Sequence, residues 1–150
     1  MAIQLLNYKE LTEENYEEIF RLAKYSWDKI SSIKADRSSV YSLIDKYKKT
    51  SIFICNNNRE IIGYGGCIIH PHIFNNNYLV MSIISIAVEK SKYKVFYTIL
   101  REIEKLAKEY GCEEISFSTN DIFEIKEKNL VKHGYLYRGN SYIKEVTYGV

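Results

Sequence analysis

Residues 78–111 read YLVMSIISIAVEKSKYKVFYTILREIEKLAKEYG, an apolar strand that runs into a long amphipathic helix closed by a glycine. Leu79 to Val88 is rich in isoleucine and valine, which predicts a buried strand. The helix is predicted from about Tyr93 to Tyr110, because one face carries the apolar residues Phe96, Ile99, Leu100, Ile103, Ala107 and Tyr110. Gly111 stands where a left-handed cap would end that helix. This stretch therefore predicts a core strand followed by the core helix.

A further strand, Ile115 to Thr119, follows the core helix. A helix of this length makes the right-handed crossover between parallel strands, so we expect this strand to lie parallel to Leu79–Val88. The other predicted elements are a strand at Ile3–Leu6, a helix capped by Thr12, a helix at Ser39–Lys48, strands at Ser51–Cys55 and Glu60–Ile69, a helix at Phe123–His133 and a final hairpin of Tyr135–Arg138 with Ser141–Lys144. Together they predict an α/β (α+β) fold with a mixed sheet of about six to seven strands flanked by about four helices, in one domain over residues 1–150.

The chain has a single proline, Pro71, which stands between His70 and His72. Proline removes a ladder donor, so we expect the strand before it to stop there. The prediction is an exposed loop that carries both histidines and leads through the three asparagines at 75–77 into the next strand.

The composition is that of an ordinary globular domain, with 46% hydrophobic and 27% charged residues. No apolar run approaches the roughly 20 residues of a membrane span, and the amino terminus lacks the regions of a signal peptide, so we expect a cytoplasmic protein. The net charge of +2 and the alternation of lysine with glutamate argue against nucleic acid as a partner. Cys55, Cys67 and Cys112 lie in or beside predicted strands, which suits buried thiols better than disulfides or a metal site.

The order of elements is strand, two helices, three strands, helix, strand, helix and two strands, with glycines at 63, 65 and 66 in one strand. This order resembles the GNAT superfamily of acetyl-CoA-dependent N-acetyltransferases over most of the chain. Pro71, Gly134-Tyr135 and the run Tyr142-Ile143-Lys144 are similar to features of small phage-encoded members. The resemblance implies acyl transfer from acyl-CoA to an amine, in host cytoplasm or in a virion if the chain is phage-encoded. The class of amine, a protein partner and a homo-oligomer stay open.

The resemblance also implies where acetyl-CoA would bind. The two parallel strands would splay apart and offer backbone groups to the amide-rich arm of the cofactor, and the start of the core helix would receive the pyrophosphate. The cofactor-binding residues implied in this way are Ile86, Val88, Lys90, Ser91, Lys92, Lys94, Val95 and Asn120. No metal is implied.

The sequence departs from the family pattern in two features. The glycines of the family's phosphate loop would fall at Lys94 and Phe96, and a tyrosine that can act as the acid would fall at Leu130. The lysines of the loop are either point charges that replace amide contacts or a solvated basic turn.

An ammonium must lose a proton before it attacks a thioester, so a base is needed. Candidates on the acceptor side are His70, His72 and Glu89, and the tyrosines Tyr135 and Tyr142 are candidates for the acid. The two histidines could equally be solvated residues, and the serines at 82 and 85 either face solvent or line the acceptor cleft.

Two hypotheses follow from these residues. The first is an atypical N-acyltransferase that works by direct attack of an amine. The second is a GNAT fold without catalysis that serves as a binding or structural component, for example of a phage particle or a host-directed complex. The sequence leaves the choice between them open.

Overall fold

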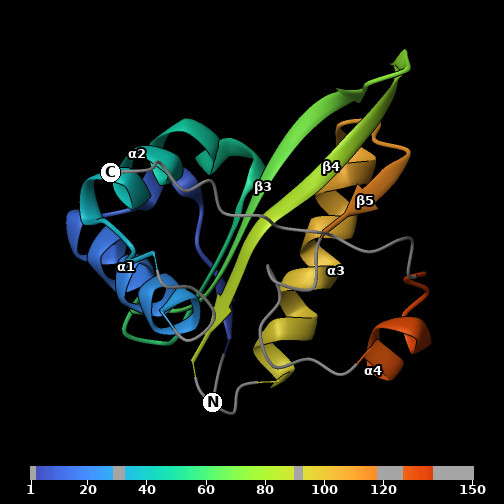
Figure 1. The fold of residues 1–150 in the computed structure, drawn as a ribbon. Helices are drawn as coiled ribbons and strands as arrows, with labels where there is room; N and C mark the ends of the chain where they lie inside the picture. The colour runs from blue at the N-terminus through green and yellow to red at the C-terminus, as the bar shows by residue number, and fades with distance from the viewer. Residues whose placement is uncertain (1–2, 29–32, 90–92, 118–126, 137–150) are drawn as a thin grey trace, which may run out of the picture.

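The computed structural model describes residues 3–28, 33–89, 93–117 and 127–136 (Figure 1). One sheet lies between helices on its two faces, with the long helix on the opposite side from the first two. The elements in chain order are β1 (Gln4–Leu5), a 3-10 turn (Tyr8–Glu10), α1 (Glu13–Trp27), α2 (Arg37–Tyr47), a 3-10 turn (Lys48–Thr50), β2 (Ile52–Cys55), β3 (Ile61–His72), β4 (Asn75–Val88), α3 (Tyr93–Glu109), β5 (Glu114–Ser116) and α4 (Glu127–Lys132).

The strands follow one another across the sheet in the order β1-β2-β3-β4-β5. The first four pair antiparallel, and β5 pairs parallel to β4, as the crossover through α3 predicts. The mixed sheet and the parallel pairing of β4 with β5 are therefore confirmed. Five strands are described, fewer than the sequence predicts, and residues 137–144 of the predicted final hairpin lie outside the described ranges.

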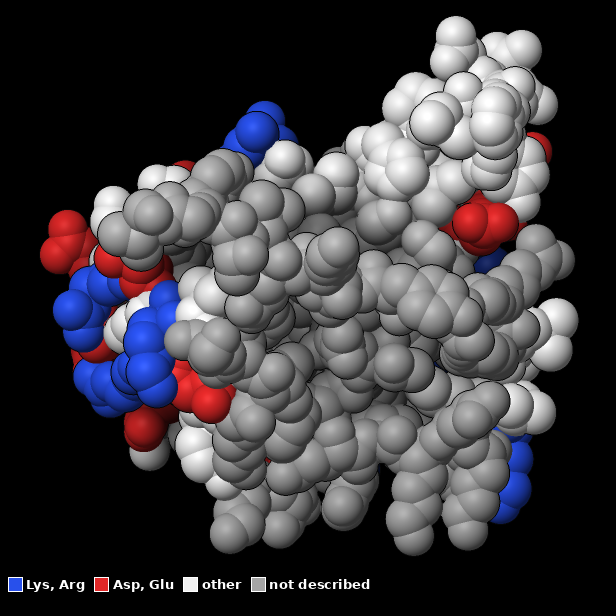
Figure 2. Space-filling model, viewed as in Figure 1, with Lys and Arg blue, Asp and Glu red and all other residues white. Residues whose placement is uncertain are grey.

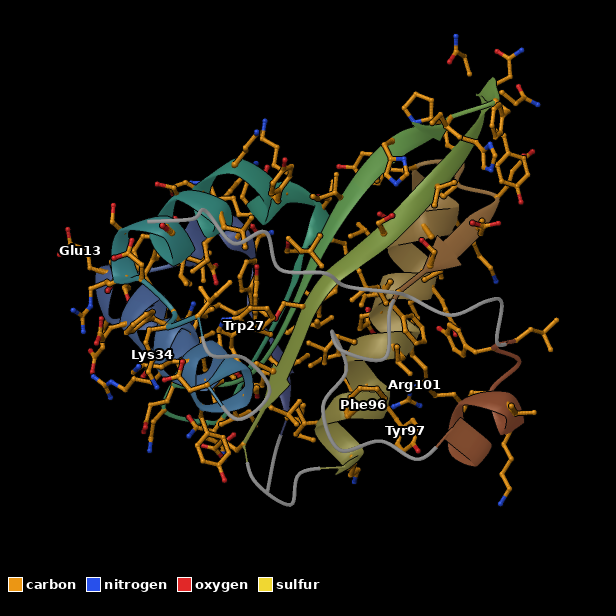
Figure 3. All side chains as sticks on the ribbon, viewed as in Figure 1. Glu13, Trp27, Lys34, Phe96, Tyr97 and Arg101 are labelled. Carbon is orange, nitrogen blue, oxygen red and sulfur yellow. The ribbon has the colours of Figure 1, made fainter. Side chains whose placement is uncertain are left out.

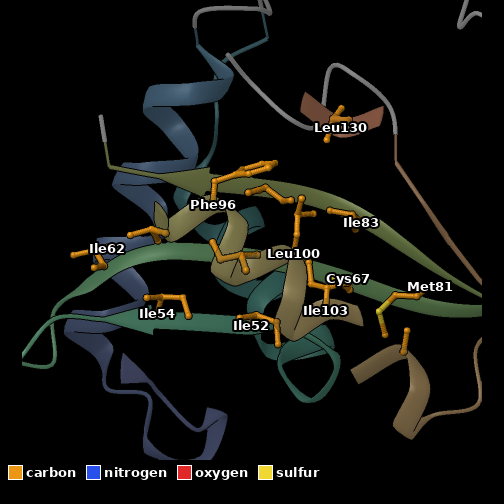
Figure 4. Close-up of a cluster of buried hydrophobic side chains, with 14 residues drawn as sticks. Ile52, Ile54, Ile62, Cys67, Met81, Ile83, Phe96, Leu100, Ile103 and Leu130 are labelled. Atoms are coloured by element: carbon orange, nitrogen blue, oxygen red, sulfur yellow. The ribbon is translucent and has the colours of Figure 1, made fainter. Parts of the chain in front are cut away.

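Helix α3 packs closely on β3 because the strand presents glycines to it. A Cβ atom built on Gly63 would lie 2.5 Å from Val95 Cγ1, and one built on Gly65 would lie 2.6 Å from Ile99 Cγ2. Ile99 and Ile103 are 0% exposed, and five of the six residues of the predicted stripe join residues of the sheet and Leu130 of α4 in the larger core cluster (Figure 4). The sixth, Tyr110, is predicted to be part of this face but lies just past the end of α3 and is 46% exposed. The glycine strand therefore sets how deeply α3 sits on the sheet.

A second core cluster lies on the other face, under α1 and α2. Thr12 caps α1 as predicted, and the cap is reciprocal: Thr12 Oγ1 accepts from the Asn15 amide, while Asn15 Oδ1 accepts from the Thr12 amide. Ile19 and Ile44 from these helices meet Tyr64 of β3 in this cluster. Ile19 and Phe20 in the middle of α1 are buried, whereas Trp27 at its end is 38% exposed.

The prediction of a loop at His70-Pro71-His72 is wrong, although His70 and Pro71 are exposed as predicted. Strand β3 runs through all three residues to a turn at Ile73 and Phe74, and the predicted loop asparagines begin β4. The result is a long hairpin that projects past the helices (Figure 1).

Proline is tolerated in β3 because it stands on a free edge. Strand β2 pairs with β3 only as far as Gly65. On that side the Cys67 amide donates to Ser51 Oγ (3.3 Å) and the Cys67 carbonyl accepts from Thr50 Oγ1 (2.6 Å). Alternation along the strand directs the nitrogen of Pro71 to the same side, where no ladder hydrogen bond is lost.

The hairpin also differs from the rest of the surface in charge. No Asp, Glu, Lys or Arg occurs from Ile61 to Val88. Figure 2 shows the end of the hairpin without charged side chains, while charges of both signs cover the α1 and α2 side. Ile73 and Phe74 at its tip are 84% and 89% exposed.

The predicted glycine cap of α3 is confirmed, because Gly111 has a positive φ angle of 71°, and Gly134 after α4 likewise has a φ of 88°. The last predicted helix is described from Glu127, and its earlier residues lie outside the described ranges. Among the described helices, none is both long and apolar enough to cross a membrane.

Candidate functional site

The parallel ladder between β4 and β5 is short. Val80–Ser82 of β4 pairs with Glu114–Ser116 of β5, and β4 then continues to Val88. Within the described residues, the β5 side of β4 has no partner strand after Ser82. The backbone groups of residues 83–88 on that side are therefore available to an extended ligand.

Strand β4 bulges where β5 leaves it. Gly66 pairs with Ser85, whereas Cys67 pairs with Ile83, so Ile84 is an extra residue on β4. A bulge interrupts the ladder and leaves a backbone amide unpaired, and bulges are frequent beside active sites. No local sequence pattern marks the bulge, since its position depends on the pairing register.

Helix α3 starts at Tyr93, shortly after β4 ends. The first amides of a helix have no partner within it, and its dipole is positive at that end. Lys94 is exposed there, whereas Val95 and Phe96 are each 2% exposed and belong to the larger core cluster. The ring of Phe96 therefore lies in the core, away from the solvent at the start of the helix.

A shallow pocket of about 350 Å³ lies along α3 beside the end of α4. Its lining consists of Lys94, Tyr97, Leu100, Arg101, Glu104 and His133. The rings of Tyr97 and His133 stack with centroids 4.6 Å apart, and Tyr97 and Arg101 project from the α4 side of α3 (Figure 3). The pocket thus combines two cations with a flat pair of rings. Sequence reasoning singled out Lys94 but missed Arg101 and His133.

A chain of hydrogen bonds crosses the three strands at the point of separation. His70 Nε2 lies 2.6 Å from Ser82 Oγ, which lies 3.2 Å from Ser116 Oγ. His70 Nδ1 lies 3.0 Å from the carbonyl oxygen of Pro71. Sequence reasoning named His70 and Ser82 but missed Ser116, because nothing in the sequence shows that it pairs with Ser82.

The structure does not bring the predicted catalytic residues into one cluster. His72 is at the hairpin tip, where its Nδ1 accepts from the Phe74 amide (3.1 Å). Glu89 is exposed at the end of β4, and its amide donates to the Ile62 carbonyl (3.1 Å). Tyr142 lies outside the described residues.

Tyr135 lies beside α3, where its hydroxyl donates to Glu104 Oε1 (2.9 Å). Burial, with the hydrogen bond to the Glu104 carboxylate, raises the pKa of Tyr135 above its ordinary value. A phenol held in this way gives up its proton less readily. Leu130, at the position of the family's acid tyrosine, is 7% exposed and packs in the core.

The predicted cofactor-binding residues fall into three groups. Ile86 and Val95 have side chains in the core, so only their backbone groups could reach a ligand. Val88 is half-buried and Lys94 is exposed. Lys90, Ser91, Lys92 and Asn120 lie outside the described residues.

The three cysteines are free thiols, of which Cys55 and Cys67 are buried and Cys112 is half-buried. Burial raises the pKa of the Cys67 thiol to about 12. In the described part of the chain, no group of three or more histidine, cysteine, aspartate or glutamate residues could hold a metal ion.

No known family model and no curated protein matches the sequence. The structure, however, is similar to solved acetyltransferases. An acetyltransferase from Trypanosoma brucei superposes with a TM-score of 0.65, covering 97% of this chain and 99% of that chain at 12% identity. A GNAT family acetyltransferase from Staphylococcus aureus gives a TM-score of 0.61, covering 97% and 98% at 15% identity.

A chain of the NatC complex, solved with a Gag peptide and CoA, gives a TM-score of 0.69 at 17% identity. The match covers 93% of this chain and 86% of that chain. At these identities the likeness concerns the fold, and this chain has the fold of the GNAT acetyltransferases.

Proposed function

We propose that this protein transfers an acyl group from an acyl-CoA thioester to an amine. The observation that carries the proposal is the bulge at Ile84, which lies where β4 and β5 separate. There the strand offers unpaired backbone groups on the β5 side, and α3 starts soon after the strand ends. An extended, amide-rich ligand with a phosphate group suits this combination of features.

The residues present fit coenzyme A. Lys94 and Arg101 place two positive charges in the α3 pocket, which suits phosphate oxygens. The stacked rings of Tyr97 and His133 beside them suit the flat face of a purine. When bound, acyl-CoA supplies an acyl group activated as a thioester.

In this protein, backbone groups of β4 would make most of the contacts with the cofactor. Residues 83–88 can pair with an extended arm, and the amide freed at the bulge can donate to a carbonyl oxygen as negative charge develops on it. The amine nitrogen forms a bond to the acyl carbon, the carbon–sulfur bond breaks, and the thiol leaves. Because these contacts come from main-chain atoms, they do not require glycine at Lys94 or Phe96.

The second candidate is a GNAT-fold protein without catalysis, which binds a partner or forms part of a larger structure such as a virion. The observation in its favour is Leu130, whose side chain is buried where the family's acid would stand. This second candidate predicts that acyl-CoA does not bind.

Thermal unfolding with and without acetyl-CoA separates the two candidates. A ligand at about 100 times its dissociation constant stabilises the native state by about 2.7 kcal/mol. For a domain of this size the midpoint should then rise by about 5–10 °C. Desulfo-CoA, which lacks the reactive sulfur, should give a similar shift, since most contacts would be made by the phosphates, the ring and the amide arm.

Charge reversal tests the pocket. Lys94→Glu and Arg101→Glu should each reduce the shift, because both would face phosphate oxygens. Lys108→Glu, on the same helix but outside the pocket, is the matched control and should keep the shift. If acetyl-CoA gives no shift at any concentration, the acyltransferase proposal is wrong and the second candidate takes its place.

A further inference from the structure

The series of hydrogen bonds from His70 through Ser82 to Ser116 lies where the proposed acceptor would meet the acyl group. Ser82 and Ser116 form the last described pair between β4 and β5, and the bulge at Ile84 follows on β4. Met81 and Ile115 belong to the core under α3, so alternation places Ser82 and Ser116 on the opposite face. This series of hydrogen bonds therefore lies on the side of the sheet away from α3.

The hydrogen-bond partners show which atom donates and which accepts at each step from Ser116 to His70. A carbonyl oxygen only accepts, so the contact of His70 Nδ1 with the Pro71 carbonyl (3.0 Å) places the proton on Nδ1. His70 Nε2 is then the acceptor, and the Ser82 hydroxyl donates to it over 2.6 Å. Because Ser82 has no second proton to give, Ser116 donates to Ser82 Oγ over 3.2 Å. Ser116 Oγ is left with lone pairs that can accept from a ligand.

We propose that His70, Ser82 and Ser116 form a proton relay that deprotonates the acceptor amine, an inference that rests on the proposed function. The ammonium gives one proton to Ser116 Oγ, each serine hydroxyl receives one proton and passes one on, and His70 Nε2 takes the last. The neutral imidazole becomes an imidazolium, and the amine is left with the lone pair that forms the new nitrogen–carbon bond. His70 is exposed, so its proton can pass on to water.

The surroundings suit a cationic acceptor. Glu114 lies two residues before Ser116 on β5, hence on the same face of the sheet, and its carboxylate accepts from the Tyr78 hydroxyl (3.5 Å). No lysine or arginine occurs in β3 or β4 to repel an ammonium. The relay therefore favours a primary amine that is protonated at neutral pH over an alcohol or a thiol.

The first test concerns the direction of the relay and needs no ligand. Nitrogen NMR of the protein labelled at histidine should show neutral His70 with its proton on Nδ1, with the signals assigned by their loss in His70→Gln. Ser82→Ala removes the donor to Nε2 and should let the other tautomer appear. A wild-type His70 that carries its proton on Nε2 would overturn the proposal, whether or not acyl-CoA binds.

The second test compares two amines as acceptors of the acetyl group, by following the release of the CoA thiol. Butylamine is almost fully protonated at neutral pH and needs a base, whereas methoxyamine is already unprotonated. A general base contributes about 100-fold or more to rate. His70→Gln and Ser82→Ala should therefore lower kcat/KM for butylamine by about 100-fold, and for methoxyamine only a few-fold.

The control and the contrary outcomes keep the two proposals separate. Ser42→Ala makes the same change on the exposed face of α2 and should leave both rates as they are. Equal losses for both amines in His70→Gln, or a loss for neither, would overturn the relay while leaving acyl transfer in place. A wild-type protein that acylates neither amine, although acetyl-CoA raises its unfolding midpoint, would also overturn it. Without that shift the proposed function itself has failed.

Discussion

The position of α3 depends on the absence of side chains at two glycines of β3, and Gly65→Ala tests this directly. The new Cβ would lie 2.6 Å from Ile99 Cγ2 and 3.2 Å from Ile103 Cδ1. Both isoleucines are 0% exposed, so neither side chain can turn out to solvent. Overpacking of this kind costs about 1–3 kcal/mol, and we expect Gly65→Ala to lower the free energy of unfolding by that amount.

A double-mutant cycle shows whether the cost comes from this contact. Ile99→Ala alone should cost about 2–5 kcal/mol through the cavity it leaves. It also removes Cγ2, the atom nearest the new methyl group, so the double variant with Gly65→Ala should be less destabilised than the sum of the singles by about 1–3 kcal/mol. Ile99→Val is the matched control: it keeps a methyl group at Cγ2, costs about 0.5–1.5 kcal/mol and should add to Gly65→Ala.

Urea unfolding at one temperature measures the wild type and the five variants, provided that the slope of the free energy against urea is the same in each. Each kcal/mol should also appear as about 2–4 °C in the thermal midpoint. If Gly65→Ala with Ile99→Ala is additive within about 0.5 kcal/mol, or if Gly65→Ala costs nothing, α3 does not rest on the glycine strand as described. The placement of the helix start beside β4 would then lose its support.

Two further predictions concern the α1 and α2 side of the sheet. Within the described residues, the buried Tyr64 hydroxyl has no hydrogen-bond partner. Tyr64→Phe should therefore leave stability unchanged or raise it by about 1 kcal/mol, and a loss of that size in urea unfolding would show that the hydroxyl is partnered. Hydrogen bonds from Arg37 and from the Tyr41 hydroxyl lower the pKa of Glu17 to about 2, so its contribution to stability is present above its unfolded pKa and is lost as the pH falls from about 4.5 towards 2. The difference in unfolding free energy between wild type and Glu17→Gln should narrow over that range, and a difference that does not change with pH would contradict this reading.

The sequence predicts the elements whose pattern is local. The apolar stripe of α3, its glycine cap and the Thr12 cap of α1 each depend on residues a few positions apart, and all three are confirmed. The path of the chain at Pro71 could not be predicted in this way. Whether a proline can stand in a strand depends on how far the neighbouring strand extends, and β2 ends its pairing at Gly65.

In the candidate site, too, single residues can be predicted from the sequence, whereas contacts that depend on strand pairing cannot. His70 can be named from the sequence because of its side chain, but its contact with Ser82, and through Ser82 with Ser116, depends on the register of three strands. The bulge at Ile84 likewise exists only in the pairing. Phe96 shows the opposite case: the sequence puts a bulky residue where the family has a glycine, and the helical phase then turns its ring into the core.

The departures from the family pattern differ in how much they affect the proposed acyl transfer. A carbonyl carbon is attacked only by an unprotonated amine, so the loss of a base would stop the reaction, and the proposed relay from His70 to Ser116 would supply that base. A thiol has a pKa of about 8.5, not far above neutral, so a thiolate can leave without the help of an acid. Leu130 therefore removes the less necessary of the two partners. The family's acid is a side chain, and Leu130 replaces it. The amides that would hold the thioester belong instead to the backbone of β4. A change of side chain at Lys94, Phe96 or Leu130 does not remove them. The fold can lose its usual acid and its loop glycines and still keep the parts of the site on which attack depends.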